Sequence, residues 1–146
     1  MTVLIHNLPV RIYYEDTDHG GVVYYANYLK YMERGRTEFL RTAGLELDDI
    51  EKNDGVLFAV TEAHTFYHAP ARFNDLLDVE TTLTEARGAR IAFRHLIRRA
   101  SDHTLLAESD IRLACMDRCG KVRRIPVALR PLLQSHVDKS AQESKA

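Results

Sequence analysis

One segment of this chain repeats its apolar residues with a helical period, and segments that alternate with a period of two flank it. From about residue 27 to 43 the apolar positions recur every three or four residues, which places them on one helical face: Tyr28, Tyr31, Met32, Gly35, Phe39 and Ala43. Gly44 follows as a helix stop. A lone amphipathic helix must cover an apolar surface supplied by other elements, and one antiparallel sheet is sufficient.

Period-two alternation predicts strands on both sides of that helix. A first strand is expected over residues 9–14, and the acidic segment 45–55 is expected to be a loop. The later strands are expected near 56–67, 77–84, 91–98, 105–116 and 122–127. The order predicts an α+β fold in which the helix covers one face of the sheet. The other face carries Thr and Arg and must be solvated or paired with another subunit.

Gly35 interrupts the apolar stripe of the predicted helix. A glycine inside a helix costs about 1 kcal/mol relative to alanine. A close approach of the helix backbone to the sheet would explain why a glycine stands there.

The length of the chain favours a single domain. The sequence of its N-terminus favours a protein that is neither secreted nor inserted into a membrane. The 146 residues suit one domain over 1–134 with a polar tail over 135–146. The N-terminus lacks the basic and apolar regions of a signal peptide, and no apolar run approaches the ~20 residues of a membrane span. Cys115 and Cys119 are too few for a zinc site and suit one buried strand thiol and one turn thiol. We therefore expect a cytoplasmic protein without membrane insertion and without a metal.

The near-neutral charge of the chain hides an asymmetry. Lys and Arg total 20 against 21 Asp and Glu, and the net charge of −1 gives no general attraction for nucleic acid. Residues 1–86 hold 7 basic and 15 acidic side chains, whereas residues 87–130 hold 11 and 4. Any single arginine of residues 87–130 can simply lie on a solvated strand face. The alternative is that several of these arginines together bind an anionic ligand.

The loop between the first strand and the helix carries the groups that chemistry needs. It places three carboxylates, Glu15, Asp16 and Asp18, beside His19 and two adjacent glycines, just before a helix start. Unpaired amides at a helix N-terminus can stabilise an oxyanion, and a nearby carboxylate can act as base or nucleophile. By spacing alone, such acidic residues are more often turn formers and helix caps.

Two motifs in this region resemble a known family. The pattern D-x-D-x-x-G-V-V-Y-Y-x-N-Y, followed by YMERGRTEFLR, resembles the acyl-CoA thioesterases of the 4-hydroxybenzoyl-CoA thioesterase family, and within it the Tol-Pal-associated branch. The match is specific over about thirty residues, Val10 to Arg41, and weaker but colinear to about Val127. Gly35 stands where relatives usually have alanine. The resemblance implies the hotdog fold, a long helix wrapped by a curved antiparallel sheet. It also implies a homo-oligomer, a dimer or homotetramer, with active sites at subunit interfaces.

The resemblance also implies roles for single residues. Asp18 is the expected catalytic base or nucleophile, and the backbone N–H of Tyr25 the expected oxyanion donor. His19, Gly21 and Val22 are expected to contact the substrate. Some relatives have His at the position of Tyr25, so any role of that histidine does not carry over. Glu33 and Arg36 are expected either as a pair buried at the helix–sheet or subunit contact or in a catalytic role. Tyr14 and Tyr28 are expected as core or acyl-pocket residues.

The predicted reaction is hydrolysis of acyl-CoA to a free acid and CoA, without a cofactor. CoA carries phosphates, and the resemblance implies that Arg and Lys hold them; we expect Arg123 and Arg124 to do so near a neighbouring subunit's Asp18. Acyl carrier protein stays open as an alternative carrier. Two other functions stay open: a non-catalytic acyl-thioester-binding or envelope-associated scaffold, and a hotdog hydroxyacyl-thioester dehydratase, which the DTDHGG loop disfavours.

Overall fold

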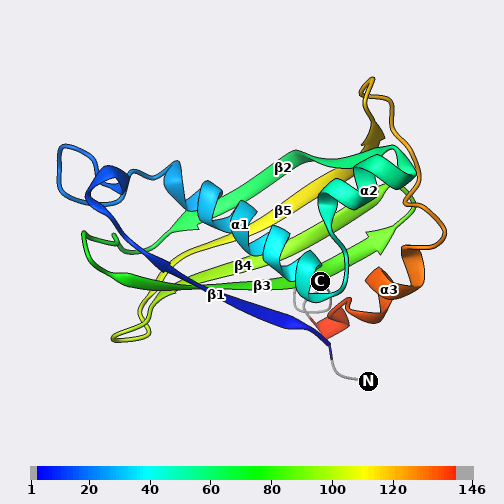
Figure 1. The fold of residues 1–146 in the computed structure, drawn as a ribbon. Coiled ribbons are helices and arrows are strands. Elements are labelled where there is room, and N and C mark those ends of the chain that lie inside the picture. Colours follow the sequence, from blue (N-terminus) through cyan, green and yellow to red (C-terminus); the bar gives the residue numbers. More distant parts are fainter. Residues whose placement is uncertain (1–2, 141–146) are drawn as a thin grey trace.

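A computed structural model describes residues 3–140 and contains one five-stranded antiparallel sheet in the order β1-β3-β4-β5-β2. The elements are β1 (Ile5–Arg11), a 3₁₀ turn (Tyr14–Asp16), α1 (Asn27–Thr42), α2 (Leu47–Asp54), β2 (Val56–Tyr67), β3 (Leu76–Arg87), β4 (Arg90–Arg99), β5 (Leu105–Asp117) and α3 (Arg130–Ser135). The sheet curves around α1, which lies across one of its faces (Figure 1). The expected α+β hotdog arrangement is therefore confirmed.

The core lies between α1 and the sheet, where the predicted helical stripe meets alternate residues of the central strands. Tyr31, Met32 and Phe39 of α1 are almost fully buried. The Phe39 ring packs edge-on against Phe93 of β4, with centroids 5.6 Å apart. On β3 the fully buried side chains facing this layer are Leu77, Val79, Thr81 and Leu83. Burial of these apolar side chains, at about 25 cal/mol per Å² of apolar surface, holds the helix on the sheet.

Gly35 lies where α1 comes closest to the sheet, as its place in the stripe predicts. A Cβ on Gly35 would stand 2.5 Å from the Thr81 hydroxyl oxygen and 3.3 Å from a Val79 methyl group. The glycine therefore allows a contact that an alanine would obstruct.

A buried polar network lies under this contact. The Thr81 hydroxyl is 3.0 Å from Nδ1 of His95, and Nη1 of Arg36 is 3.3 Å from Nε2 of the same ring. Burial, with the Arg36 charge adding to it, lowers the pKa of His95 well below its ordinary value. The ring is thus neutral: Nε2 accepts from Arg36, and Nδ1–H donates to Thr81. Glu33 is exposed and Arg36 contacts His95, so the two do not form a buried pair at the helix–sheet contact, whereas their burial at a subunit contact stays a prediction.

The secondary structure departs from the prediction in four places. Residues 122–127 form no strand: they make one bridge, Met116 to Val122, and Pro126 has no N–H for a ladder. The predicted acidic loop contains α2, which buries only Ile50 and so carries little apolar signal. The short helix α3 was also missed. The first strand exists but ends at Arg11, because the chain turns into the 3₁₀ segment at Tyr14.

The C-terminal segment remains in contact with the fold for several residues after α3. Val137 pairs with Leu83, and the amide of Asp138 donates to the Leu83 carbonyl at 2.8 Å. The rest of the predicted polar tail, residues 141–146, lies outside the described residues. Within residues 3–140, no helix combines the length and the apolar character that a membrane span requires.

Candidate active site

The loop before α1 is closed at its base by Asp16. The Asp16 carboxylate accepts the Tyr13 N–H at 2.7 Å, and its carbonyl accepts the Tyr24 N–H at 3.0 Å and the Asn27 side-chain amide at 2.9 Å. Burial, with the nearby Asp16 carboxylate adding to it, raises the pKa of Tyr31 under this loop. Asp16 therefore fixes the turn through its carboxylate and its carbonyl.

Asp18 stands in the exposed part of the same loop. Its Oδ1 accepts the Gly20 N–H at 2.9 Å, and its own N–H donates to the Val22 carbonyl at 2.8 Å. Gly21 has φ +81°, a left-handed conformation that favours glycine and lets the chain turn back. No described residue takes the other carboxylate oxygen, so Asp18 presents a free, exposed acceptor.

The amide of Tyr25 is the second free group of the loop. The Tyr24 N–H donates to the Asp16 carbonyl at 3.0 Å, and the Asn27 N–H donates to the Tyr24 carbonyl at 2.9 Å. No acceptor among the described residues takes the N–H of Tyr25 or of Ala26, and Tyr25 lies two residues before α1, at the positive end of the helix dipole. Residues 17 and 23 form an antiparallel bridge, so Asp18 lies within one short hairpin and Tyr25 follows that hairpin by two residues.

Aromatic rings surround this hairpin. Tyr24, Tyr25 and Tyr67 form a chain of ring contacts with centroids 5.0 and 6.0 Å apart, and all three are exposed. Tyr28 is buried, as expected for a core residue. Tyr14 is 79 % exposed and contacts the Phe73 ring edge-on, so its placement in the core is wrong for a single chain. The 3₁₀ turn directs it outward.

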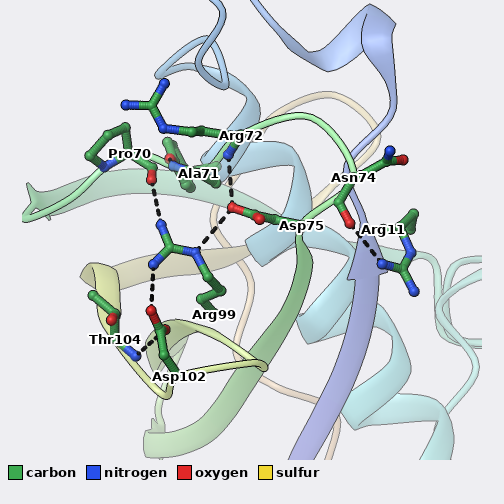
Figure 2. A network of polar contacts seen from close by, with 10 residues as sticks. Arg11, Pro70, Ala71, Arg72, Asn74, Asp75, Arg99, Asp102 and Thr104 are labelled. Atoms are coloured by element: carbon green, nitrogen blue, oxygen red, sulfur yellow. Dashed lines mark hydrogen bonds and ion pairs between the residues drawn. The ribbon is translucent and has the colours of Figure 1, made fainter.

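The segment 70–75 supports the loop from behind, and sequence analysis missed it. The Ala71 carbonyl accepts the Val23 N–H at 2.8 Å, Val22 pairs with Arg72, and the Ala71 N–H donates to the Tyr28 hydroxyl at 3.1 Å. Figure 2 shows how Arg99 and Asp75 hold this segment. The only local signal is the turn-forming Asn74–Asp75 pair, with Asn74 at φ +72°.

The structure places Asp18, His19, Gly21, Val22 and Tyr25 on one short stretch of chain before α1. The segment that carries Arg123 and Arg124 lies at the opposite end of the sheet (Figure 1). There the two arginines line an open groove of about 660 Å³ with Arg87 and Arg90. Arg123 pairs with Asp117 at 3.0 Å, whereas no described carboxylate lies within 4.0 Å of the other three guanidinium groups. The backbone N–H of Lys121, with Arg123 adding to it, lowers the pKa of Asp117. The groove therefore offers mostly unpaired positive charge.

A smaller cavity of about 230 Å³ lies beside α1, on the side of the sheet edge β2. Its wall is mostly apolar, and it includes the buried Arg36 and the exposed Glu33. The apolar lining residues are Leu40, Leu47, Phe58, Val60, Ile91, Phe93 and Leu113. Such a wall suits a small apolar group. Within residues 3–140 no group of three or more His, Cys, Asp or Glu side chains is arranged to hold a metal ion.

Comparison with known proteins places these features in context. Residues 13–135 match the sequence pattern of the thioesterase-like superfamily. The acyl-CoA thioester hydrolase YbgC of Escherichia coli O6:H1 is 40 % identical over 130 residues, which cover 88 % of this chain and 96 % of the relative. The acyl-CoA thioesterase YbgC of Haemophilus influenzae is 41 % identical over 122 residues, covering 84 % and 86 %. The crystal structure of a probable thioesterase from Bartonella henselae superposes with a TM-score of 0.79 at 32 % identity, covering 84 % of this chain and all of that one.

Proposed function

This chain belongs to the thioesterase-like superfamily and is a thioester hydrolase, and we propose that it cleaves acyl-CoA with the carboxylate of Asp18. One observation carries the assignment of the site. An exposed carboxylate with a free oxygen lies within one short hairpin, and an unpaired amide follows this hairpin at the start of α1. Acyl transfer needs these two groups: one to activate or supply the nucleophile, and one to stabilise the oxyanion.

The proposed reaction begins with the thioester carbonyl oxygen against the Tyr25 N–H. In one route Asp18 takes a proton from a water molecule as the water oxygen attacks the carbonyl carbon. The tetrahedral intermediate then breaks its C–S bond, and the CoA thiolate takes up a proton. In the other route the Asp18 carboxylate itself attacks the carbonyl carbon, and the C–S bond breaks to release the CoA thiolate, which takes up a proton; water then hydrolyses the mixed anhydride and regenerates Asp18. His19, Gly21 and Val22, which form the exposed rim of the loop, are the proposed contacts of the bound thioester.

A single-turnover reaction in ¹⁸O water can demonstrate the anhydride route, because only that route can place the label in Asp18. General-base catalysis places the label in the released acid alone. Attack by water on the aspartyl carbon of a mixed anhydride places it in Asp18, where mass spectrometry of the peptide detects it.

Replacement of Asp18 by Asn tests the assignment. The Asn side chain keeps an acceptor for the Gly20 N–H and the residue is exposed, so Asp18→Asn is expected to fold normally. Loss of a base or nucleophile lowers kcat by about 10²–10⁴-fold. Glu15→Gln, an exposed carboxylate of the same loop, is the matched control and should keep kcat. Thiol release from acyl-CoA by Asp18→Asn at the wild-type rate would reject Asp18 as the catalytic group.

We further propose that the CoA phosphates bind the Arg87, Arg90, Arg123 and Arg124 groove of a second copy. In one chain the segments that line this groove lie at one end of the sheet and the loop before α1 lies at the other (Figure 1). β2 is a sheet edge and exposes Val60, Phe66 and Tyr67, which supports pairing with another strand. Two β2 edges paired antiparallel about a two-fold axis would bring the loop end of one chain beside the groove end of the other.

Complementation between inactive variants tests this arrangement. One chain carries Asp18→Asn, and the other carries Arg123→Glu with Arg124→Glu. If each site combines the loop of one chain with the groove of the other, a mixed dimer contains one site in which both the loop and the groove are native. Mixing the two variants should therefore restore activity. If the subunits are shown to have exchanged and activity is still not restored, the groove and the loop of one site belong to the same chain.

The remaining proposals concern the cell and the assembly. The free thiols Cys115 and Cys119 support a reducing, cytoplasmic location. Similarity to proteins named YbgC supports an association with the Tol-Pal system. The sheet face opposite α1 has no covering helix in Figure 1, which supports further pairing of dimers into a homotetramer.

A further inference from the structure

The segment 70–75 contacts every part of the chain that flanks the catalytic loop. Before the loop, the Ile12 N–H donates to the Asp75 carbonyl at 2.9 Å, and the Asn74 N–H donates to the Ile12 carbonyl at 3.0 Å. After the loop, Val22 and Val23 pair with Arg72 and Ala71. The segment thus holds the entry and the exit of the loop together.

The same segment also holds the start of α1. The buried Ala71 N–H donates to the hydroxyl of Tyr28, which stands at the second position of the helix. Tyr28 is three residues after the free amide of Tyr25. A displacement of residues 70–75 would therefore move both groups of the proposed site relative to each other.

The Arg99 guanidinium fixes this segment from β4. Its Nε donates to Asp75 Oδ2 at 3.1 Å, Nη2 to the Pro70 carbonyl at 2.9 Å and Nη1 to Asp102 Oδ2 at 3.0 Å (Figure 2). Asp75 Oδ2 also accepts the Arg72 N–H at 2.9 Å. One planar fork thus joins the beginning and the end of the segment, which the single ammonium of a lysine cannot do.

The Arg99–Asp75 ion pair is less exposed to solvent than the neighbouring Arg98–Glu80 pair. The side chains of Arg99 and Asp75 are 20 % and 23 % exposed. The adjacent Arg98 is 36 % exposed and approaches Glu80 only at 3.9 Å. Arg99 therefore has the more ordered contact, and Arg98 provides a matched control next to it in the sequence.

We propose that Arg99 and Asp75 are positioning residues for the thioesterase reaction, acting through residues 70–75 on the geometry of Asp18 and the Tyr25 amide. The proposal rests on the proposed function of that loop. It predicts an effect on the chemical step rather than on substrate affinity, because neither residue belongs to the loop rim or to the arginine groove.

The test compares Arg99→Gln with Arg98→Gln. A misplacement of catalytic groups by about 1 Å can cost up to ~100-fold in rate. We expect Arg99→Gln to lower kcat about tenfold with KM within about twofold of wild type, and Arg98→Gln to leave both unchanged. Arg99→Lys should not restore kcat. If Arg99→Gln does not fold, kcat and KM of Arg99→Lys and Asp75→Asn are compared with those of Arg98→Gln instead.

A double-mutant cycle distinguishes positioning from a general loss of stability. Tyr28→Phe removes only the acceptor of the Ala71 N–H, so it acts on the same segment as Arg99→Gln. The two effects on kcat should be less than additive, whereas Tyr28→Phe and Arg98→Gln should add. Wild-type kcat in folded Arg99→Gln, or full additivity with Tyr28→Phe, would overturn the proposal. Asp18→Asn measured in parallel reports on the proposed function itself.

Discussion

Replacing Gly35 by alanine should destabilise this protein, although helix propensity and the usual residue of the resembled family both favour alanine. In an open helix the change would stabilise by about 1 kcal/mol. Here the added Cβ would stand 2.5 Å from the Thr81 hydroxyl oxygen, a distance that real Cβ contacts do not show. The helix or Thr81 must therefore move.

Neither movement is easy. Thr81 is β-branched and fully buried, and its hydroxyl lies 3.0 Å from His95 Nδ1. Overpacking a core costs about 1–3 kcal/mol, and a buried hydrogen bond left unmade costs about 1–3 kcal/mol more. Against the gain in propensity, the net loss is about 1–5 kcal/mol. In a chain of this size each kcal/mol lowers Tm by roughly 3 °C.

Denaturant and thermal unfolding at one protein concentration measure the effect. The double variant Gly35→Ala with Thr81→Ala separates the clash from other causes, because it removes the obstructing oxygen. Its destabilisation should be smaller than the sum of the two single effects by at least ~1 kcal/mol. If Gly35→Ala equals or exceeds the wild type in stability, the close approach does not limit residue 35, and the reasoning fails.

Three further predictions address the buried ring, the loop and the core. Because burial, with Arg36 adding to it, lowers the pKa of His95 well below 6.5 in the fold, the unfolded chain alone takes up its proton below that pH. Stability from this group is thus fully present above pH 6.5 and is lost as the pH falls below it, at up to about 1.4 kcal/mol per pH unit while the folded ring stays neutral. Unfolding at pH 7.5 and at pH 5 should show this loss in the wild type and not in His95→Gln. Gly20→Ala places a Cβ 3.3 Å from Asp18 Oδ1; thiol-release assays should show kcat several-fold lower, while the unfolding free energy stays within about 0.5 kcal/mol. Phe93→Ala should lower that free energy by about 3–5 kcal/mol, because the ring is buried against Phe39; an unchanged denaturation midpoint would contradict this placement.

Local patterns in the sequence were sufficient for the main elements of this fold. The helical period over residues 27–43 and the long alternating runs follow directly from which side chains one face must bury, and the structure has α1 and β2 to β5 there. The glycine inside the stripe predicted a close approach, which Thr81 provides. The motif around Asp18 indicated a thioesterase through its resemblance to a known family, which the sequence shows directly because the residues of the motif are contiguous.

Contacts between distant segments decided the rest. Arg99 and Asp75 are 24 positions apart, and Arg87 and Arg124 are further apart still, so no local period relates them. The strand expected over 122–127 failed because Pro126 cannot donate to a ladder, and α2 was hidden because it buries one apolar residue. The sequence by itself determined which groups are available for chemistry. Only the tertiary structure decided which of them share a site, because packing on the sheet, rather than order along the chain, sets the distances between them.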